Sequence, residues 1–93
     1  MKDRQRPVRL DRDAAVAIAA QAVAFLAADD DRLGRFLALT GLSPTELRAG
    51  LGQPAFLGAV LDHLLGDEAL LLAFAEAAGI APELPATARR LLP

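Results

Sequence analysis

Residues 13–41 read DAAVAIAAQAVAFLAADDDRLGRFLALTG, and this stretch decides the fold. Its first half places apolar residues at the spacing of one helical face, namely Ile18, Ala22, Phe25 and Leu26. Asp11 or Asp13 provides a capping carboxylate, so we predict a helix that runs to about residue 28. Gln21 is the only polar residue between Asp13 and Asp29. A helix that is apolar on all sides is normally central in its domain or buried in an oligomer.

The second half of the stretch predicts another helix. Residues 29–31 are three aspartates that end the first helix and cap the next, one face of which carries Leu33, Phe36, Leu37 and Thr40. Gly41 is the expected left-handed residue at its end. Residues 43–46 (Ser-Pro-Thr-Glu) are typical of a capping box, which predicts a short helix that stops at Gly50 and Gly52.

Three further helices complete the prediction. Residues 54–65 carry a wide apolar stripe and are followed by a glycine. Residues 67–79 again begin with a capping aspartate and end with a glycine. Beyond Pro82, about eight residues form a last helix, with Arg89 and Arg90 at the end where cations favour the helix dipole.

The chain also carries a weak internal repeat. When the sequence is shifted along itself by 38 positions, the following residues align: Ala17/Ala55, Leu26/Leu64, Asp29/Asp67, Leu33/Leu71, Phe36/Phe74, Gly41/Gly79 and Pro44/Pro82. Any two capped helical hairpins share aspartate starts and glycine stops, but the matched phenylalanines and leucines favour a repeat. The repeat predicts two equivalent helix pairs that pack about a rough local two-fold axis.

Composition supports an all-helical chain. The strong helix formers alanine (21) and leucine (18) dominate, valine and isoleucine total six, and tyrosine and tryptophan are absent. We therefore predict an all-α fold, a compact single-domain bundle of five to six short helices over residues 13–93. A flexible basic N-terminal arm of residues 1–12 precedes it. The lack of cysteine excludes disulfides and fits a reducing, cytoplasmic compartment.

The basic N-terminal residues and the apolar residues 14–28 that follow them are arranged as in a signal peptide. Asp11, Asp13 and Gln21 interrupt that arrangement, and alanine is only weakly hydrophobic, so we expect a cytoplasmic protein. A membrane span needs about 20 strongly apolar residues, and none is expected here.

Charge is unevenly distributed along the chain. Residues 14–88 carry three cations and nine acidic residues, which argues against DNA binding by the helical body. Residues 43–65 have the helix, turn and helix arrangement of a helix-turn-helix motif, but residues 54–65 contain no lysine or arginine that could contact DNA. The arm is either a solubilising tail or binds nucleic acid or an acidic protein, and its candidate partner-binding residues are Arg4, Arg6, Arg9 and Arg12. On the helical body, the candidates are Asp62 and His63.

Four segments stand out in order: RFLALTGL (35–42), LR (47–48), FLGAVLDHLL (56–65) and DEALLLAFA (67–75). With a closing PE…ARRL pattern (82–91), they resemble a small uncharacterised bacterial family, domain of unknown function family 3572, over residues 14–92. The resemblance implies a short, single-domain, cytosolic helical protein and no particular activity. The basic arm lies outside it.

His63 is the only histidine, next to Asp62 and four residues before Asp67. A metal or catalytic centre would combine these residues with Glu68. Neighbouring residues on a helix point about 100° apart, Gly66 breaks the helix before Asp67, and no second histidine or cysteine completes a ligand set. We therefore expect a surface or edge-of-core histidine and no metal.

Asp62 interrupts an apolar helix without a capping role. Either it accepts a hydrogen bond from Arg35 or Arg48, or it faces water. The aspartates of residues 29–31 are explained as caps rather than as a cation site. Because no phosphate-binding loop or nucleophile motif occurs, we expect no enzyme and no cofactor.

Three functional hypotheses remain, in descending order. The first is a helical module that binds a partner protein or itself, because so small a core leaves apolar surface around Ala20, Val23, Ala24, Leu39 and Leu72. The second is a regulatory binder of nucleic acid or an acidic partner through the arm. The third is a metal or catalytic protein centred on His63. The sequence names no partner, pathway or oligomeric state.

Overall fold

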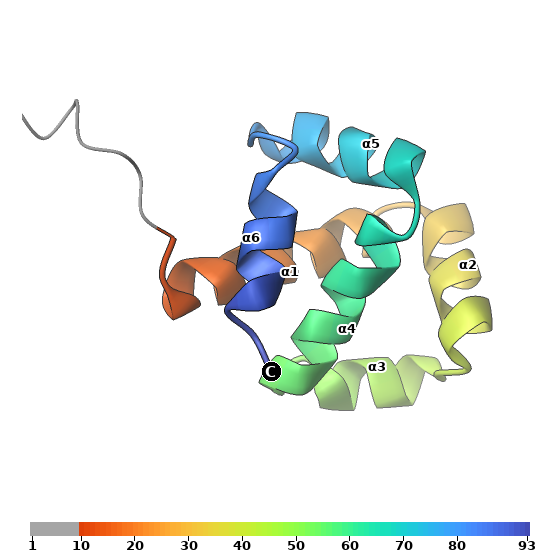
Figure 1. The fold of residues 1–93 in the computed structure, drawn as a ribbon. Helices are drawn as coiled ribbons and strands as arrows, with labels where there is room; N and C mark the ends of the chain where they lie inside the picture. The colour runs from red at the N-terminus through yellow and green to blue at the C-terminus, as the bar shows by residue number, and fades with distance from the viewer. Residues whose placement is uncertain (1–9) are drawn as a thin grey trace, which may run out of the picture.

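The computed structural model describes residues 10–93, which form six helices around one apolar core (Figure 1). The helices are α1 (Arg12–Ala27), α2 (Asp30–Thr40), α3 (Pro44–Gly50), α4 (Pro54–Leu65), α5 (Glu68–Ala78) and α6 (Leu84–Arg90). Residues 10–93 contain no strand. The predicted all-α, single-domain bundle is therefore confirmed.

Helix α1 is the centre of the bundle, as its apolar sequence predicts. It packs against α2, α4, α5 and α6, and Figure 1 shows it passing behind α4 and α6. Its inner face consists of buried and mostly small side chains, namely Ala15, Ile18, Ala19, Ala22 and Leu26. Because the distance between packed helices depends on the side chains at the contact, these alanines let the neighbouring helices lie close to α1.

Short-range signals set the helix ends where the sequence predicts them. The carboxylates of Asp29 and Asp67 each accept a hydrogen bond from the backbone N–H three residues further on, at 3.0 Å and 3.1 Å. Gly41 and Gly79 adopt φ angles of 75° and 68°, which glycine tolerates because it lacks a Cβ atom. The capping box at residues 43–46 is present with both of its hydrogen bonds.

The two halves of the proposed repeat share these ends but differ in their third helix. The pairs α1–α2 and α4–α5 each pack together, and Phe36 and Phe74 are both buried. Helix α6 buries Pro85 and Ala88 and packs on α1 and α4, whereas α3 buries no residue completely. The equivalence holds for the caps and the buried phenylalanines, and the local two-fold axis stays a prediction.

Helix α1 begins one residue before the predicted start of the helical domain. Asp11, rather than Asp13, is the cap, and its carboxylate accepts a hydrogen bond from the Ala14 N–H at 2.8 Å. Arg12 is therefore the first residue of α1, and Leu10 packs against the core. None of the helices in residues 10–93 combines the length and the hydropathy that a membrane-crossing segment needs.

Candidate functional site: an apolar groove and a histidine pocket

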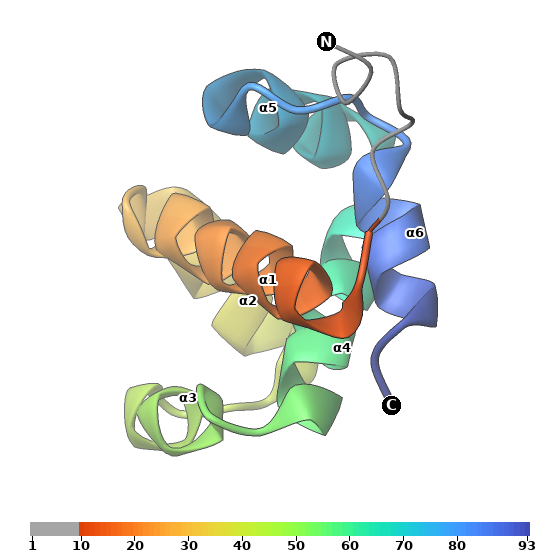
Figure 2. The same cartoon turned by 90° about the vertical axis from the view of Figure 1, so that its left-hand side faces the viewer.

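An apolar groove of about 520 Å³ lies between α1 and α5, and we name it the α1–α5 groove. Figure 2 shows α5 above α1, with α6 to one side of both helices. Helix α1 contributes Gln21, Ala24 and Phe25 to its lining, its C-cap contributes Ala28, and α5 contributes Phe74, Ala77 and Ala78. The two phenylalanine rings meet edge to face, with centroids 5.5 Å apart.

The groove follows from the residues that face each other across the two helices. Ala24, Ala28 and Ala77 are exposed and too short to fill the space between the helices. Phe74 is buried, whereas Phe25 is only partly buried. The guanidinium of Arg32, from α2, lies 4.4 Å from the centre of the Phe25 ring. This cation–π contact places a positive charge beside the groove.

The sequence located part of this surface. Ala20 and Ala24 are exposed, as predicted, whereas Val23 is only partly exposed and packs against the core. Leu39 and Leu72 are 65% and 47% exposed, as predicted, but neither lines the groove. Phe25 was assigned to the core stripe of the first helix, and the structure leaves it partly open to solvent. Helical spacing alone places Phe25 beside Leu26 and cannot show that α5 stops short of covering it.

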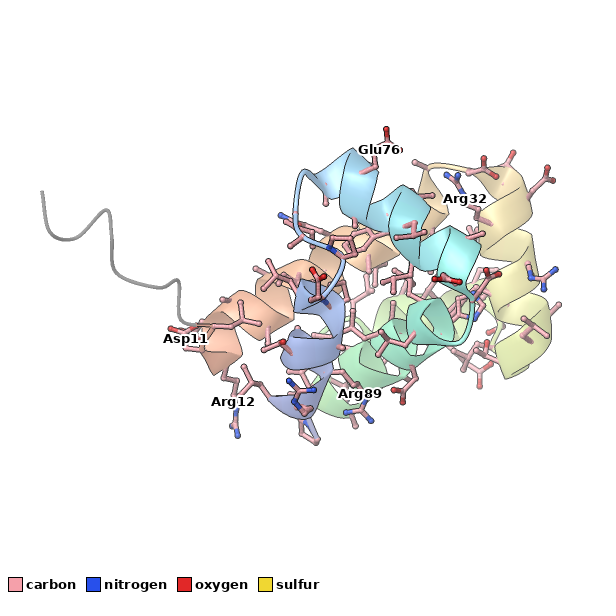
Figure 3. The ribbon with its side chains drawn as sticks, turned by 45° about the horizontal axis from the view of Figure 1, so that its top comes forward. Asp11, Arg12, Arg32, Glu76 and Arg89 are labelled. Carbon is pink, nitrogen blue, oxygen red and sulfur yellow. The ribbon has the colours of Figure 1, made fainter. Side chains whose placement is uncertain are left out.

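Asp62 has a partner that the sequence did not predict. Its Oδ1 accepts a hydrogen bond from Arg89 Nε at 2.7 Å, so neither Arg35 nor Arg48 holds it. The Nη1 of Arg89 also donates to the backbone oxygens of Leu92 and Pro93, at 3.1 Å and 3.2 Å. The hydrogen bond to Asp62 raises the pKa of Arg89. In Figure 3 the arginine lies between α6 and α4, and it joins both helices to the end of the chain.

Gly58 makes room for this arginine. A Cβ atom at that position would lie 2.9 Å from the Pro93 oxygen and 3.0 Å from Arg89 Nη1. Such distances are too short for ordinary contacts, so a side chain at residue 58 would push the arginine or the C-terminal residues away.

The Arg89–Asp62 pair is expected to contribute a small coupling energy. In a double-mutant cycle of Arg89→Ala and Asp62→Ala, we expect about 0.2–1 kcal/mol, because both side chains are accessible to water and partly screened. Urea unfolding of the four chains measures it. Arg48→Ala, combined with Asp62→Ala, is the control and should show no coupling. A coupling energy of zero for Arg89 and Asp62 would contradict a joining role for this pair.

His63 lies at the edge of the core, as expected. Its ring centroid is 4.9 Å from that of Phe36, and the two ring planes cross at 81°. The Nε2 atom is buried and has no hydrogen-bond partner among residues 10–93. Burial lowers the pKa of His63, and the charge of Arg35 lowers it further, while Asp67 acts in the opposite direction.

A smaller hollow of about 270 Å³ adjoins this histidine, and we name it the histidine pocket. Its lining consists of Arg35, Leu39, Asp62, His63, Gly66 and Asp67. The structure thus brings the predicted Asp62 and His63 to one pocket. In the part of the chain that the structure describes, no three His, Asp or Glu side chains are grouped to hold a metal ion.

The arginines predicted to bind a partner do not join either hollow in the described structure. Arg4, Arg6 and Arg9 lie outside the described residues, so the hypothesis of a binding arm stays a prediction. Arg12 is exposed on the first turn of α1 and projects away from the bundle in Figure 3. It lines neither the α1–α5 groove nor the histidine pocket.

Fold and surface together define a small all-α domain with an apolar groove beside its central helix. The chain belongs to a family described as protein of unknown function (DUF3572), whose sequence model matches residues 12–93. The match includes all six helices, so the resemblance seen in the sequence is confirmed. No curated protein and no solved structure matches the chain.

Proposed function

We propose that this domain is a protein-interaction module that binds an amphipathic helix of a partner protein in the α1–α5 groove. The observation that carries the proposal is the groove itself, whose lining is two phenylalanines, four alanines and one glutamine. Grooves of this chemistry receive large apolar side chains that a partner helix presents at positions i, i+3, i+4 and i+7.

The outer side of α1, next to the groove, suits the close approach of a helix. This helix carries no charged residue between Asp13 and its end, and its exposed positions are Ala17, Ala20, Gln21, Ala24 and Ala27. A partner that covers them removes no charged group from water, which avoids the main cost of burying a polar surface. The small side chains also keep the two backbones close.

The charge of the domain favours a basic partner. Residues 10–93 carry six arginines and eleven carboxylates, and three of these carboxylates, on Asp29–Asp31, directly follow Ala28 of the groove. Lysine or arginine beside the apolar face of a partner helix would complement this surface, whereas a second copy of the same acidic domain would not.

The test uses a synthetic helix of about 14 residues, long enough to fold on binding, with leucines on one face and lysines on the other. In NMR titrations we expect its addition to shift the amide resonances of Ala24, Phe25 and Ala77. A matched peptide with glutamate in place of lysine should bind at least about tenfold more weakly.

Two variants of α5 separate the groove from the rest of the helix. Ala77→Arg should abolish binding of the leucine–lysine peptide, because the new side chain fills the groove and repels lysine. Leu72→Arg adds the same charge at an exposed position outside the groove and should leave binding intact. Equal binding by both variants, or shifts that gather around Leu72, would overturn the proposal. Concentration-dependent dimerisation that Ala77→Arg abolishes would replace the partner helix by a second copy.

A further inference from the structure

Helix α2 packs along α1, with Leu37 partly buried against the core, and it has one completely buried side chain. Phe36 is 1% exposed, and it is the only residue of α2 that the core buries fully. Its ring meets two aromatic rings edge to face, Phe56 at 6.5 Å and His63 at 4.9 Å, and both residues belong to α4. A change in the charge of the His63 ring therefore acts directly on Phe36, which we call the anchor of α2.

The surroundings of His63 accept a neutral imidazole but not a charged one. With its proton on Nδ1, the neutral ring leaves Nε2 as an unpaired acceptor, which costs much less than an unpaired charged donor would. Protonation adds a charged N–H at a buried atom that has no acceptor among residues 10–93. A buried charge without a hydrogen bond is costly, so the charged ring is stabilised only when water reaches Nε2. The Phe36 ring of α2 lies against the imidazole, so a displacement of this ring from α4 would open that side of His63 to water.

Three charged groups surround this imidazole, and they do not compensate the added charge. Arg35, on α2, lines the same pocket and repels a second cation. Asp67, at the start of α5, attracts it, but Oδ1 of this carboxylate already accepts the backbone N–H of Leu70. Asp62, the neighbour on α4, is paired with Arg89. Burial and the charge of Arg35 together outweigh Asp67, so the pKa of His63 is lowered.

Helix α2 also reaches the α1–α5 groove. Arg32 lies one helical turn before Phe36, and its guanidinium covers the Phe25 ring that lines the groove. A displacement of α2 that frees Phe36 would therefore withdraw this cation from Phe25. The histidine pocket and the groove are connected through a single short helix.

We propose that His63 is a proton-operated latch: protonation of its imidazole displaces Phe36 of α2 from its contacts on α4, which shifts α2 along α1, withdraws Arg32 from Phe25 and so changes the α1–α5 groove. The last step rests on the proposed function, because only a binding groove gives the change a consequence.

The direction of the pH dependence follows from the lowered pKa of His63. Above the ordinary pKa of histidine, the imidazole is neutral in both the latched and the released state, and the latch is fully stable. As the pH falls below that value, the released state takes up the proton first, so the latched state loses stability. The loss is complete once the pH has passed the lowered pKa of the latched state.

Amide hydrogen exchange tests the latch without any ligand. Between about pH 7.5 and about pH 5.5, the window in which histidine changes charge, we expect α2 to lose protection while α4 and α6 keep theirs. His63→Phe keeps an aromatic ring against Phe36 but takes up no proton, so its α2 should stay protected. In the wild-type chain, the imidazole C–H resonances should titrate along the same curve as the α2 amides. Unchanged α2 protection, or an equal loss in His63→Phe, would overturn the latch.

The leucine–lysine peptide then separates the latch from the proposed function. We expect its affinity for the wild-type chain to change between the two pH values and its affinity for His63→Phe to stay constant. Equal affinity at both values, with α2 released at the lower one, would show that the latch does not act on the groove. Absence of binding at neutral pH would refute the proposed function and leave the exchange result for the latch intact.

Discussion

Replacing Phe36 by alanine is expected to lower the free energy of unfolding by about 3–5 kcal/mol. The ring is 1% exposed and is the only side chain of α2 that the core buries fully, so its removal leaves a cavity and weakens the attachment of that helix. A domain of this size is stable by roughly 5–14 kcal/mol in total. Urea unfolding followed by circular dichroism measures the loss, which would leave little stability in a domain at the lower end of that range.

Leu39→Ala is the matched control on the same helix. Leu39 is 65% exposed, and we expect its replacement to change the free energy of unfolding by less than about 0.5 kcal/mol. If both variants lost the same amount, Phe36 would not be the anchor of α2, and the latch built on its contact with His63 would lose its basis.

The ends of the helices were predictable because their signals are local. The aspartate caps at residues 29 and 67, the glycine stops at residues 41 and 79, and the capping box at residues 43–46 depend on neighbours within four residues. The overall fold class follows from composition, because a chain rich in alanine and leucine with few β-branched residues has no good strand.

The contacts between helices were not predictable in the same way. Asp62 and Arg89 are 27 residues apart, and nothing in the spacing of α4 and α6 selects Arg89 over Arg35 or Arg48. The contact of His63 with Phe36 likewise depends on how α2 crosses α4. The signal that could have pointed to this contact is Gly58, because a glycine in the interior of a helix often has a packing reason, and here it leaves room for Arg89.

The groove escaped prediction for a different reason. Helix α1 is apolar on all sides, so its sequence contains no polar face that marks which alanines point outward. Phe25 and Leu26 differ by one position, yet the core covers Leu26 completely and Phe25 only in part. The packing of the other helices decides which side of α1 is covered, and that packing cannot be predicted from the sequence of α1 alone.

A pair of substitutions separates the two sides of α1. Ala22 is fully buried and Ala20 is exposed, although they lie only two positions apart. Ala22→Asp is expected to cost about 3–5 kcal/mol at neutral pH, because it places an uncompensated charge in the core. Ala20→Asp, the matched control, should change the free energy of unfolding by less than about 0.5 kcal/mol. Urea unfolding of both variants near neutral pH measures the difference.

The pH dependence of the two variants gives a second measurement. Burial raises the pKa of the carboxyl group introduced at residue 22, so the folded state binds its proton more tightly than the unfolded state does. The stability lost by Ala22→Asp should therefore be recovered as the pH falls, whereas Ala20→Asp should show no such recovery. Equal losses in both variants would contradict the sidedness of α1. A loss confined to Ala20→Asp that grows with protein concentration would mean that the outer side of α1 is buried between copies, and the acidic domain would then bind itself.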